Sequence, residues 1–536
     1  MNGVILLLPP LVPILMALFV HRLQGRWWLP AAAVPALYLG LMGEEGSALS
    51  LPWLMLGMHL ALDTTGRLFL AFGSAIWMLA AMFIPRSDLE SGHRKQTFLL
   101  AMTGNLLLIL AADMLTFYVG FALMGLSAYG LVWGRSQRAR HAARVYLAFA
   151  LIGELALFTA LLLVMANGGS MLFAALHAKP IPEAALLLLL LGFGIKVALP
   201  GLHLWLPRAY GLAPVFGVAV LSGPMMKAGL LGWLRFLPFG EPLEPVWGDG
   251  LLLLGVAGIV LGMLIGVVQR EPRAVLAYSS IAKMGLFTAL IGFCLNQPLL
   301  AGAVLPAIVL LALHHLMVKP MLFMGLALRQ VKDTGSWILP ALILLALSLA
   351  AFPLTGGGAA KSALSTAMGG QLSGLLLLSA IAGAGLMGRF LWLVKGGAVT
   401  GQQDPVPGLG WLLLLPVAVW TPFAWEAISF EWNSLLPLVA GAGLFVLGLA
   451  CRRWLDSLRP GMGNKTWRLN LGVKRIDADM PDPGNPLRQL WHPLRQAARP
   501  LRFDPDGQVN PALRDPAVWW LLLMLALLGA LSLSLF

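Results

Sequence analysis

The chain has 536 residues, of which 59% are hydrophobic and only 11% are charged. Soluble globular domains are about a quarter charged, so this composition exceeds what one soluble core can bury and indicates a bilayer as solvent. The formal net charge of +13 lies mostly in short loops between apolar runs, which indicates membrane orientation and excludes a nucleic-acid partner. The two cysteines, Cys294 and Cys451, form no metal-ligand pattern, so we expect no metal and no cofactor.

Apolar runs of roughly 17–25 residues, the length that spans a hydrocarbon core, recur along almost the whole chain. The first run, 4–21, has no basic region before it and no small-residue cleavage site, which favours a retained span over a signal peptide. The last run is 518–536. Because open strands leave backbone groups unpaired in lipid, the sequence predicts an all-α polytopic membrane protein with about sixteen transmembrane helices.

If the chain crosses the membrane at these runs, the charged loop residues separate by sign between the two sides of the membrane. One side collects basic groups such as Arg138 and Arg270, and the other collects acidic groups such as Glu44 and Glu241. Cytoplasmic loops carry the excess of lysine and arginine, so the basic side is expected to be cytoplasmic and both termini periplasmic or outside. We therefore expect a multi-pass protein of the cell inner (plasma) membrane.

The segment 452–517 is the long polar stretch of the sequence, and it is rich in proline and arginine. Its piece LRQLWHPLRQAARPLRF alternates basic and apolar residues, as a surface helix does. Two interpretations stay open for this basic, cytoplasmic segment. It is a tether that contacts lipid headgroups before the last span, or it is a docking site for another subunit, including a soluble cytoplasmic one.

Several ionisable residues interrupt the predicted spans, although a charge at mid-helix costs about 2.5–3.5 kcal/mol on insertion scales. Burial disfavours the charged form of a lysine or a glutamate, which eases proton exchange at working pH, and histidines and water can complete a relay. A single buried lysine can equally be a structural ion-pair partner, but lysines in five separate spans weaken that interpretation. The candidates are Lys196, His203, Lys227, Lys283, His314, His315, Lys319 and Lys361, with Glu154 as an acidic group.

Spacing and helix breakers group some of these candidates. His315 and Lys319 are four residues apart and share a helix face, and Lys196 and His203, seven apart, share one if the helix continues. The spans of Lys196 and Lys361 are also interrupted, which leaves backbone groups at mid-membrane for water or ions to satisfy. The breakers are Pro200 and Gly201 after Lys196, and Pro353, Gly356, Gly357 and Gly358 before Lys361.

Five segments resemble, in order, hallmark segments of the antiporter-like subunits of respiratory complex I. They are DMLTFYVGFALMGLSAYGLV at 113–132, GFGIKVALPGLHLWLPRAYGLAPVFGVAVLSGPMMKAGLLGWLR at 192–235, QREPRAVLAYSSIAKMGL at 269–286, HHLMVKPMLFMGLA at 314–327 and FPLTGGGAAK at 352–361. The second keeps the family order Lys, Pro, His-x-Trp-Leu-Pro, Ala-Pro, Lys-x-Gly. The same fold serves Mrp-type sodium/proton antiporters, membrane-bound hydrogenases, formate hydrogenlyase and a bicarbonate-uptake complex.

The resemblance implies two inverted five-helix repeats with broken helices and a proton path across the middle of the membrane. Lys196 is then the central lysine of the first broken helix, Lys227 its neighbour, and Lys361 the lysine of the second broken helix toward the outlet. His314, His315 and Lys319 link the two halves. The expected domains are N-terminal helices at 1–96, repeats at 97–237 and 250–396, C-terminal helices at 408–451, the basic segment 452–517 and a final helix at 518–536.

One position departs from the family pattern. The family has Trp-Glu in its fifth span, with the glutamate paired to a lysine on the following helices, whereas this chain has Phe121–Ala122. Three interpretations stay open: Glu154, one span later, supplies the missing carboxylate; Glu154 only neutralises a lysine; or the first half-channel is impaired or takes its carboxylate from a partner.

The favoured hypothesis is a proton-translocating, antiporter-like subunit that has no redox or hydrolytic site of its own and belongs to a multisubunit membrane complex. One alternative is the proton-driven membrane subunit of an inorganic-carbon (bicarbonate/CO2) uptake complex with a zinc carbonic-anhydrase-like partner. Another is a non-conducting scaffold, which Ala122 motivates and the buried lysines oppose. Sodium stays an alternative ion, although few carboxylates lie within the spans. The expected partners are other membrane subunits and the lipid bilayer.

Overall fold

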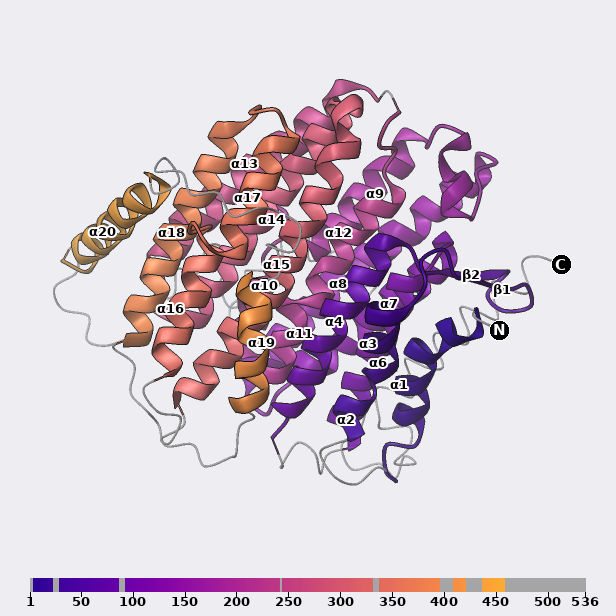
Figure 1. Ribbon diagram of the computed structural model, residues 1–536, viewed down its shortest axis with the longest axis horizontal. Helices are drawn as coiled ribbons and strands as arrows, with labels where there is room; N and C mark the ends of the chain where they lie inside the picture. Colours follow the sequence, from indigo (N-terminus) through magenta and orange to yellow (C-terminus); the bar gives the residue numbers. More distant parts are fainter. Residues whose placement is uncertain are drawn as a thin grey trace, which may run out of the picture. The chain divides into compact units, whose positions relative to one another are not determined.

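A computed structural model gives the arrangement of the chain, and almost every element in it is a helix (Figure 1). It describes residues 3–22, 28–85, 92–241, 243–330, 337–395, 408–420 and 436–457. The N-terminal elements are η1 (Val4–Leu7), α1 (Leu8–Leu18), α2 (Trp28–Ala31), α3 (Val34–Met42), β1 (Ala48–Leu51), β2 (Met58–Ala61) and α4 (Thr64–Met82). The sequence did not predict β1 and β2, which pair antiparallel in the loop between α3 and α4.

Two sets of helices follow. The first set is α6 (Gly92–Leu110), α7 (Met114–Val132), α8 (Gln137–Ala166), η2 (Phe173–Ala178), α9 (Glu183–Lys196), α10 (Trp205–Leu212), α11 (Val215–Ser222) and α12 (Pro224–Phe236). The second set is α13 (Pro245–Val267), α14 (Pro272–Asn296), α15 (Pro298–Gln330), α16 (Ile338–Leu349), α17 (Gly356–Ala367) and α18 (Ser373–Lys395). Each set has two helices, a long helix of 30 or 33 residues, and then an interrupted helix. That the sets are inverted repeats at 97–237 and 250–396 stays a prediction.

The described residues contain eight helices that are long and apolar enough to cross a bilayer, together with five shorter apolar helices. The last of the shorter ones are α19 (Gly408–Trp420) and α20 (Leu436–Ser457). The chain is therefore a polytopic helical membrane protein, although the predicted count of about sixteen spans is not confirmed. The predicted last span 518–536 and nearly all of the basic segment 452–517 lie outside the described residues.

Both interrupted helices break at the same short pattern, an alanine, an apolar residue and a proline. Ala198 precedes Leu199–Pro200 with φ at +59°, and Ala351 precedes Phe352–Pro353 with φ at +60°. A left-handed conformation at an alanine costs about 1–2 kcal/mol, so the surrounding structure must hold each break in place. In the first break the indole Nε1 of Trp205 donates to the carbonyl of Ile195 at 2.9 Å, which replaces a helical hydrogen bond.

The first break corrects one prediction made from spacing. Helix α9 ends at Lys196 and α10 begins at Trp205, so His203 lies in the turn between them. Lys196 and His203 therefore do not share the face of a continuous helix, because the backbone turns at Ala198 and Gly201, where φ is positive. His315 and Lys319 do share one helix, since α15 runs unbroken through both.

Helix α15 lies at the centre of this arrangement (Figure 1). It packs against α4, α11, α12, α14, α16, α17 and α19. Its Pro320 lies against Gly223, where the chain passes from α11 to α12. This contact places residues one turn further along α12 beside the middle of α15, where the two histidines of the sequence motif lie.

Candidate functional site

The ionisable residues predicted from the sequence are almost all inside the protein. The side chains of Lys227, His315 and Lys319 are 0% exposed. His314, Lys196, His203 and Lys283 are 4%, 6%, 8% and 9% exposed, and Lys361 is half-buried. Buried charges are costly unless hydrogen bonds or opposite charges compensate them, so the contacts of each group matter.

Lys227 and His315 form the central contact of the site. Lys227 is one turn into α12, and its Nζ lies 2.6 Å from Nδ1 of His315 on α15. If the ammonium donates to Nδ1, the neutral ring carries its proton on Nε2. The buried Nε2 has no hydrogen-bond partner on the protein. A lysine and a histidine in this arrangement can exchange a proton directly.

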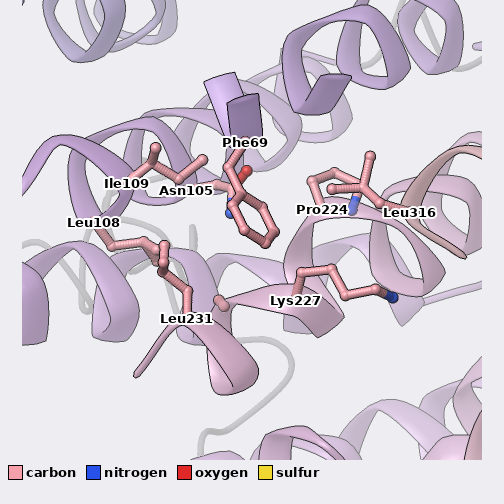
Figure 2. Close-up of a pocket in the computed structure, with 9 residues that line it drawn as sticks. Phe69, Asn105, Leu108, Ile109, Pro224, Lys227, Leu231 and Leu316 are labelled. Carbon is pink, nitrogen blue, oxygen red and sulfur yellow. The ribbon is translucent and has the colours of Figure 1, made fainter. Parts of the chain in front are cut away.

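An apolar pocket isolates Lys227 on its other side. Its lining includes Phe69 of α4, Leu231 of α12 and Leu316 of α15, with Asn105 of α6 as a polar member. Figure 2 shows the methylene stem of Lys227 at the pocket edge, with the ammonium end pointing away from Asn105 and Phe69. The polar end of Lys227 is thus directed toward His315 rather than toward the pocket.

Lys319 joins α15 to α14. Its Nζ donates to the carbonyl of Leu276 at 2.7 Å and to the hydroxyl of Ser279. Ser279 belongs to the Tyr-Ser-Ser motif of the sequence, and through its hydroxyl this motif contacts the site. The charge of Lys319 also acts on His315, so these two groups of α15 are electrostatically coupled.

The second half of the site continues toward the broken helix α16–α17. Nε2 of His314 lies 2.7 Å from the hydroxyl of Ser348, which is near the end of α16. The charge of Lys283 on α14 acts on His314, and the charge of Lys361 on α17 acts on Lys283. A row of basic groups, made of Lys227, His315, Lys319, Lys283 and Lys361, therefore runs through the site. Electrostatic coupling links its members from Lys319 to Lys361.

Lys196 forms the other end of the row. Its Nζ donates to the hydroxyl of Tyr146 on α8 at 3.0 Å, and Tyr146 donates in turn to the carbonyl of Gly125 on α7 at 3.0 Å. The ammonium also lies 5.8 Å from the ring centroid of Phe121 and 5.4 Å from that of Tyr146. Aromatic faces attract a desolvated cation, so these rings help to hold Lys196 inside the protein.

Two predicted candidates have different surroundings. Glu154 on α8 is 6% exposed, and its charge acts on Lys196. His203 is also buried, but the charge that acts on it is that of Arg208, one turn along the chain, and the structure does not place it in the row. Among the described residues, no group of three or more histidines, cysteines and carboxylates lies close enough to hold a metal ion.

The polar partners of the row were not predicted from the sequence. Tyr146 and Ser348 hold Lys196 and His314, and both are polar residues inside predicted spans. A polar residue inside a predicted span was the available signal, since such groups need a partner in lipid. Trp205 was part of the quoted motif, but its bond to the broken helix depends on the turn that only the structure shows.

Comparison with known sequences places this arrangement in a family. The family described as NADH:quinone oxidoreductase/Mrp antiporter, TM, matches residues 111–387, more than half of the chain. The chain belongs to this family. The match covers α7 to most of α18, and hence every member of the row.

Individual relatives match shorter stretches of this chain than the family does. Hydrogenase-4 component B of Escherichia coli (strain K12) is 32% identical over 224 residues, which are 39% of this chain and 33% of the relative. NADH-ubiquinone oxidoreductase chain 4 of Tetraodon nigroviridis is 29% identical over 252 residues, 44% of this chain and 54% of the relative. The chain thus spans between a third and about half of these relatives.

Two solved structures share the fold. A chain of the Mrp complex from Dietzia sp. DQ12-45-1b aligns with a TM-score of 0.70 at 22% identity, covering 99% of this chain and 63% of that one. A chain of the membrane-bound sulfane sulfur reductase, an archaeal respiratory membrane complex, aligns with a TM-score of 0.65 at 20% identity, covering 98% and 99%. The predicted fold class is confirmed.

Proposed function

We propose that this chain is a proton-translocating subunit of a multisubunit membrane complex. Protons move along the row from Lys196 through Lys227, His315, Lys319 and Lys283 to Lys361, with water between groups that do not touch. The observation that carries the proposal is the contact of 2.6 Å between Lys227 and His315, inside the protein and between helices of the two sets. Family membership supports it, because the family is described as including the Mrp antiporter and the relatives are named as a hydrogenase component and an oxidoreductase chain.

The Lys227–His315 contact can pass a proton across the width of one imidazole ring. The ammonium of Lys227 gives a proton to Nδ1, and the ring releases its other proton from Nε2 to a water molecule of the path, so that Nδ1 then carries the proton and Nε2 does not. The ring then returns to its first tautomer before the next transfer. Lys227 is then neutral and must be reprotonated. Its next proton comes from the part of the row that begins at Lys196.

Repulsion between neighbouring cations gives the transfer a driving force. The charges of Lys227, Lys319, Lys283 and His314 all act on His315. At close range in a medium of low dielectric, like charges cannot all be present at once. A proton that enters at one position therefore favours release at the next, and a charge moves along the row without every group being ionised.

Replacing Lys319 with methionine is expected to lower proton flux by about 100-fold, because proton-transfer groups contribute on that scale. Methionine keeps an unbranched side chain, one atom shorter than that of lysine, but removes the donor to Leu276 and Ser279. The measurement uses the purified complex in proteoliposomes that contain a pH-sensitive dye, with an imposed membrane potential. The matched control is Lys395→Met at the exposed end of α18, which should conduct like wild type. An assembled Lys319→Met complex with wild-type flux would contradict the proposal and favour a scaffold.

The partners and orientation follow from the same proposal. We expect other membrane subunits to copurify with the chain, with the basic loops cytoplasmic and the cell inner membrane as its location. Copurification of redox subunits would favour a respiratory or hydrogenase-type complex. A large zinc-binding soluble partner would favour the inorganic-carbon alternative.

A further inference from the structure

The face of α7 that meets α8 lacks a carboxylate of its own but receives one from α8. Ala122 and Gly125 are three residues apart on α7, so both lie on one face of the helix. A Cβ added to Gly125 would lie 2.5 Å from Oε1 of Glu154 and 3.7 Å from its Cδ. The carboxyl group of Glu154 therefore rests against the bare backbone of Gly125, one turn from Ala122.

Glu154 is an unusual group for this position. It is 6% exposed, and its Oε1 has no hydrogen-bond partner on the protein. Asp113 is the other buried carboxylate among the described residues, and it caps the first turn of α7 by accepting from the backbone N–H of Thr116 at 2.7 Å. Glu154 caps no helix, so helix capping does not account for its burial.

Glu154 and Lys196 are linked through Gly125 and Tyr146. The hydroxyl of Tyr146 on α8 accepts from Nζ of Lys196 at 3.0 Å and donates at 3.0 Å to the carbonyl of Gly125, the residue against which the carboxyl group of Glu154 rests. An isolated carboxylate in an apolar interior is costly, and an opposite charge nearby offsets part of that cost.

We infer that Glu154 is the acidic partner of Lys196, relocated from α7 to α8. Gly125, which has no side chain, leaves the space that the carboxyl group of Glu154 occupies. The inference rests on the proposed function and adds to it the group that controls proton occupancy of Lys196. With Lys196 protonated, the ionised carboxylate stabilises the ammonium. When Lys196 passes its proton on, Glu154 loses that stabilisation and can take a proton from water, which it returns to Lys196.

The test moves the carboxylate back to α7. Glu154→Gln keeps the size of the side chain and removes the charge, and it is expected to lower proton flux in reconstituted complex by about 100-fold. Adding Ala122→Glu in the same chain should recover most of the flux, because the carboxylate returns to the same face one turn away. Glu183→Gln, at the exposed start of α9, is the matched control and should conduct like wild type.

The outcomes separate this inference from the proposed function. Wild-type flux in Glu154→Gln, with flux lost in Lys319→Met, would overturn the relocation and leave the proton path in place. Loss of flux that Ala122→Glu does not recover would also overturn it. If Glu154→Gln does not assemble, the double variant decides: assembly and flux in the double variant support the relocation, and failure of both contradicts it. Wild-type flux in both Glu154→Gln and Lys319→Met would contradict the proposed function itself.

Discussion

Lys227→Ala is expected to abolish most proton flux through the assembled complex, a loss of about 100-fold or more. The change removes the group that lies 2.6 Å from Nδ1 of His315, and alanine is too short to carry a proton across the α12–α15 contact. The side chain of Lys227 is 0% exposed and lies at the edge of an apolar pocket, so its truncation leaves mainly apolar surroundings beside His315. Flux is measured as dye-reported acidification of proteoliposomes under an imposed potential.

The control for this change is Lys179→Ala, which removes a lysine from the exposed loop before α9. It should leave flux and assembly unchanged. Lys227→Ala leaves Nδ1 of His315 without this partner, so flux is compared only in preparations whose assembly matches that of wild type. Normal flux in an assembled Lys227→Ala complex would exclude the Lys227–His315 contact from the path.

Gly357→Ala is expected to damage both stability and flux through packing alone. A methyl group at this position of α17 would overlap the carbonyl oxygen of Ser348 and lie 3.1 Å from Cε1 of His314. Overpacking of this kind costs about 1–3 kcal/mol. Because α16 and α17 must then move apart, the hydrogen bond between His314 and Ser348 should lengthen and break the second half of the row.

The comparison for this prediction is Gly374→Ala near the start of α18, where an added Cβ meets no atom within 4 Å. Thermal unfolding of the purified complex should show a lower Tm for Gly357→Ala and an unchanged or slightly higher Tm for Gly374→Ala. Proton flux, measured in parallel, should fall only in the first variant. Equal Tm values and equal flux would show that α17 has room beside Ser348, contrary to the structure.

The class of fold and the members of the site could be predicted from the sequence because lipid imposes simple rules. Apolar runs must be helices, and ionisable residues inside them must turn inward, so Lys227, His315 and Lys319 were identifiable without a structure. The position of His315 and Lys319 on one helix also followed from their spacing, since no break intervenes. The breaks at Pro200 and Pro353 were visible as helix-breaking residues.

The pairing of these residues could not be predicted in the same way. Lys227 and His315 are 88 residues apart, and their contact depends on how Gly223 and Pro320 let α12 approach α15. The shared helix face expected for Lys196 and His203 was wrong because the sequence shows that a helix can break but not where the chain turns. The β1–β2 hairpin was missed because four-residue strands are too short for a period-2 pattern to stand out.

Whether the row carries protons or sodium is decided by following both ions in the same vesicles. Sealed proteoliposomes with the intact complex are given a membrane potential, with internal pH and radioactive sodium uptake followed in parallel. We expect proton entry at the same rate with and without sodium, absent from protein-free vesicles and lost in Lys227→Ala. Sodium uptake that Lys227→Ala abolishes, or proton entry that this variant leaves intact, would contradict this expectation.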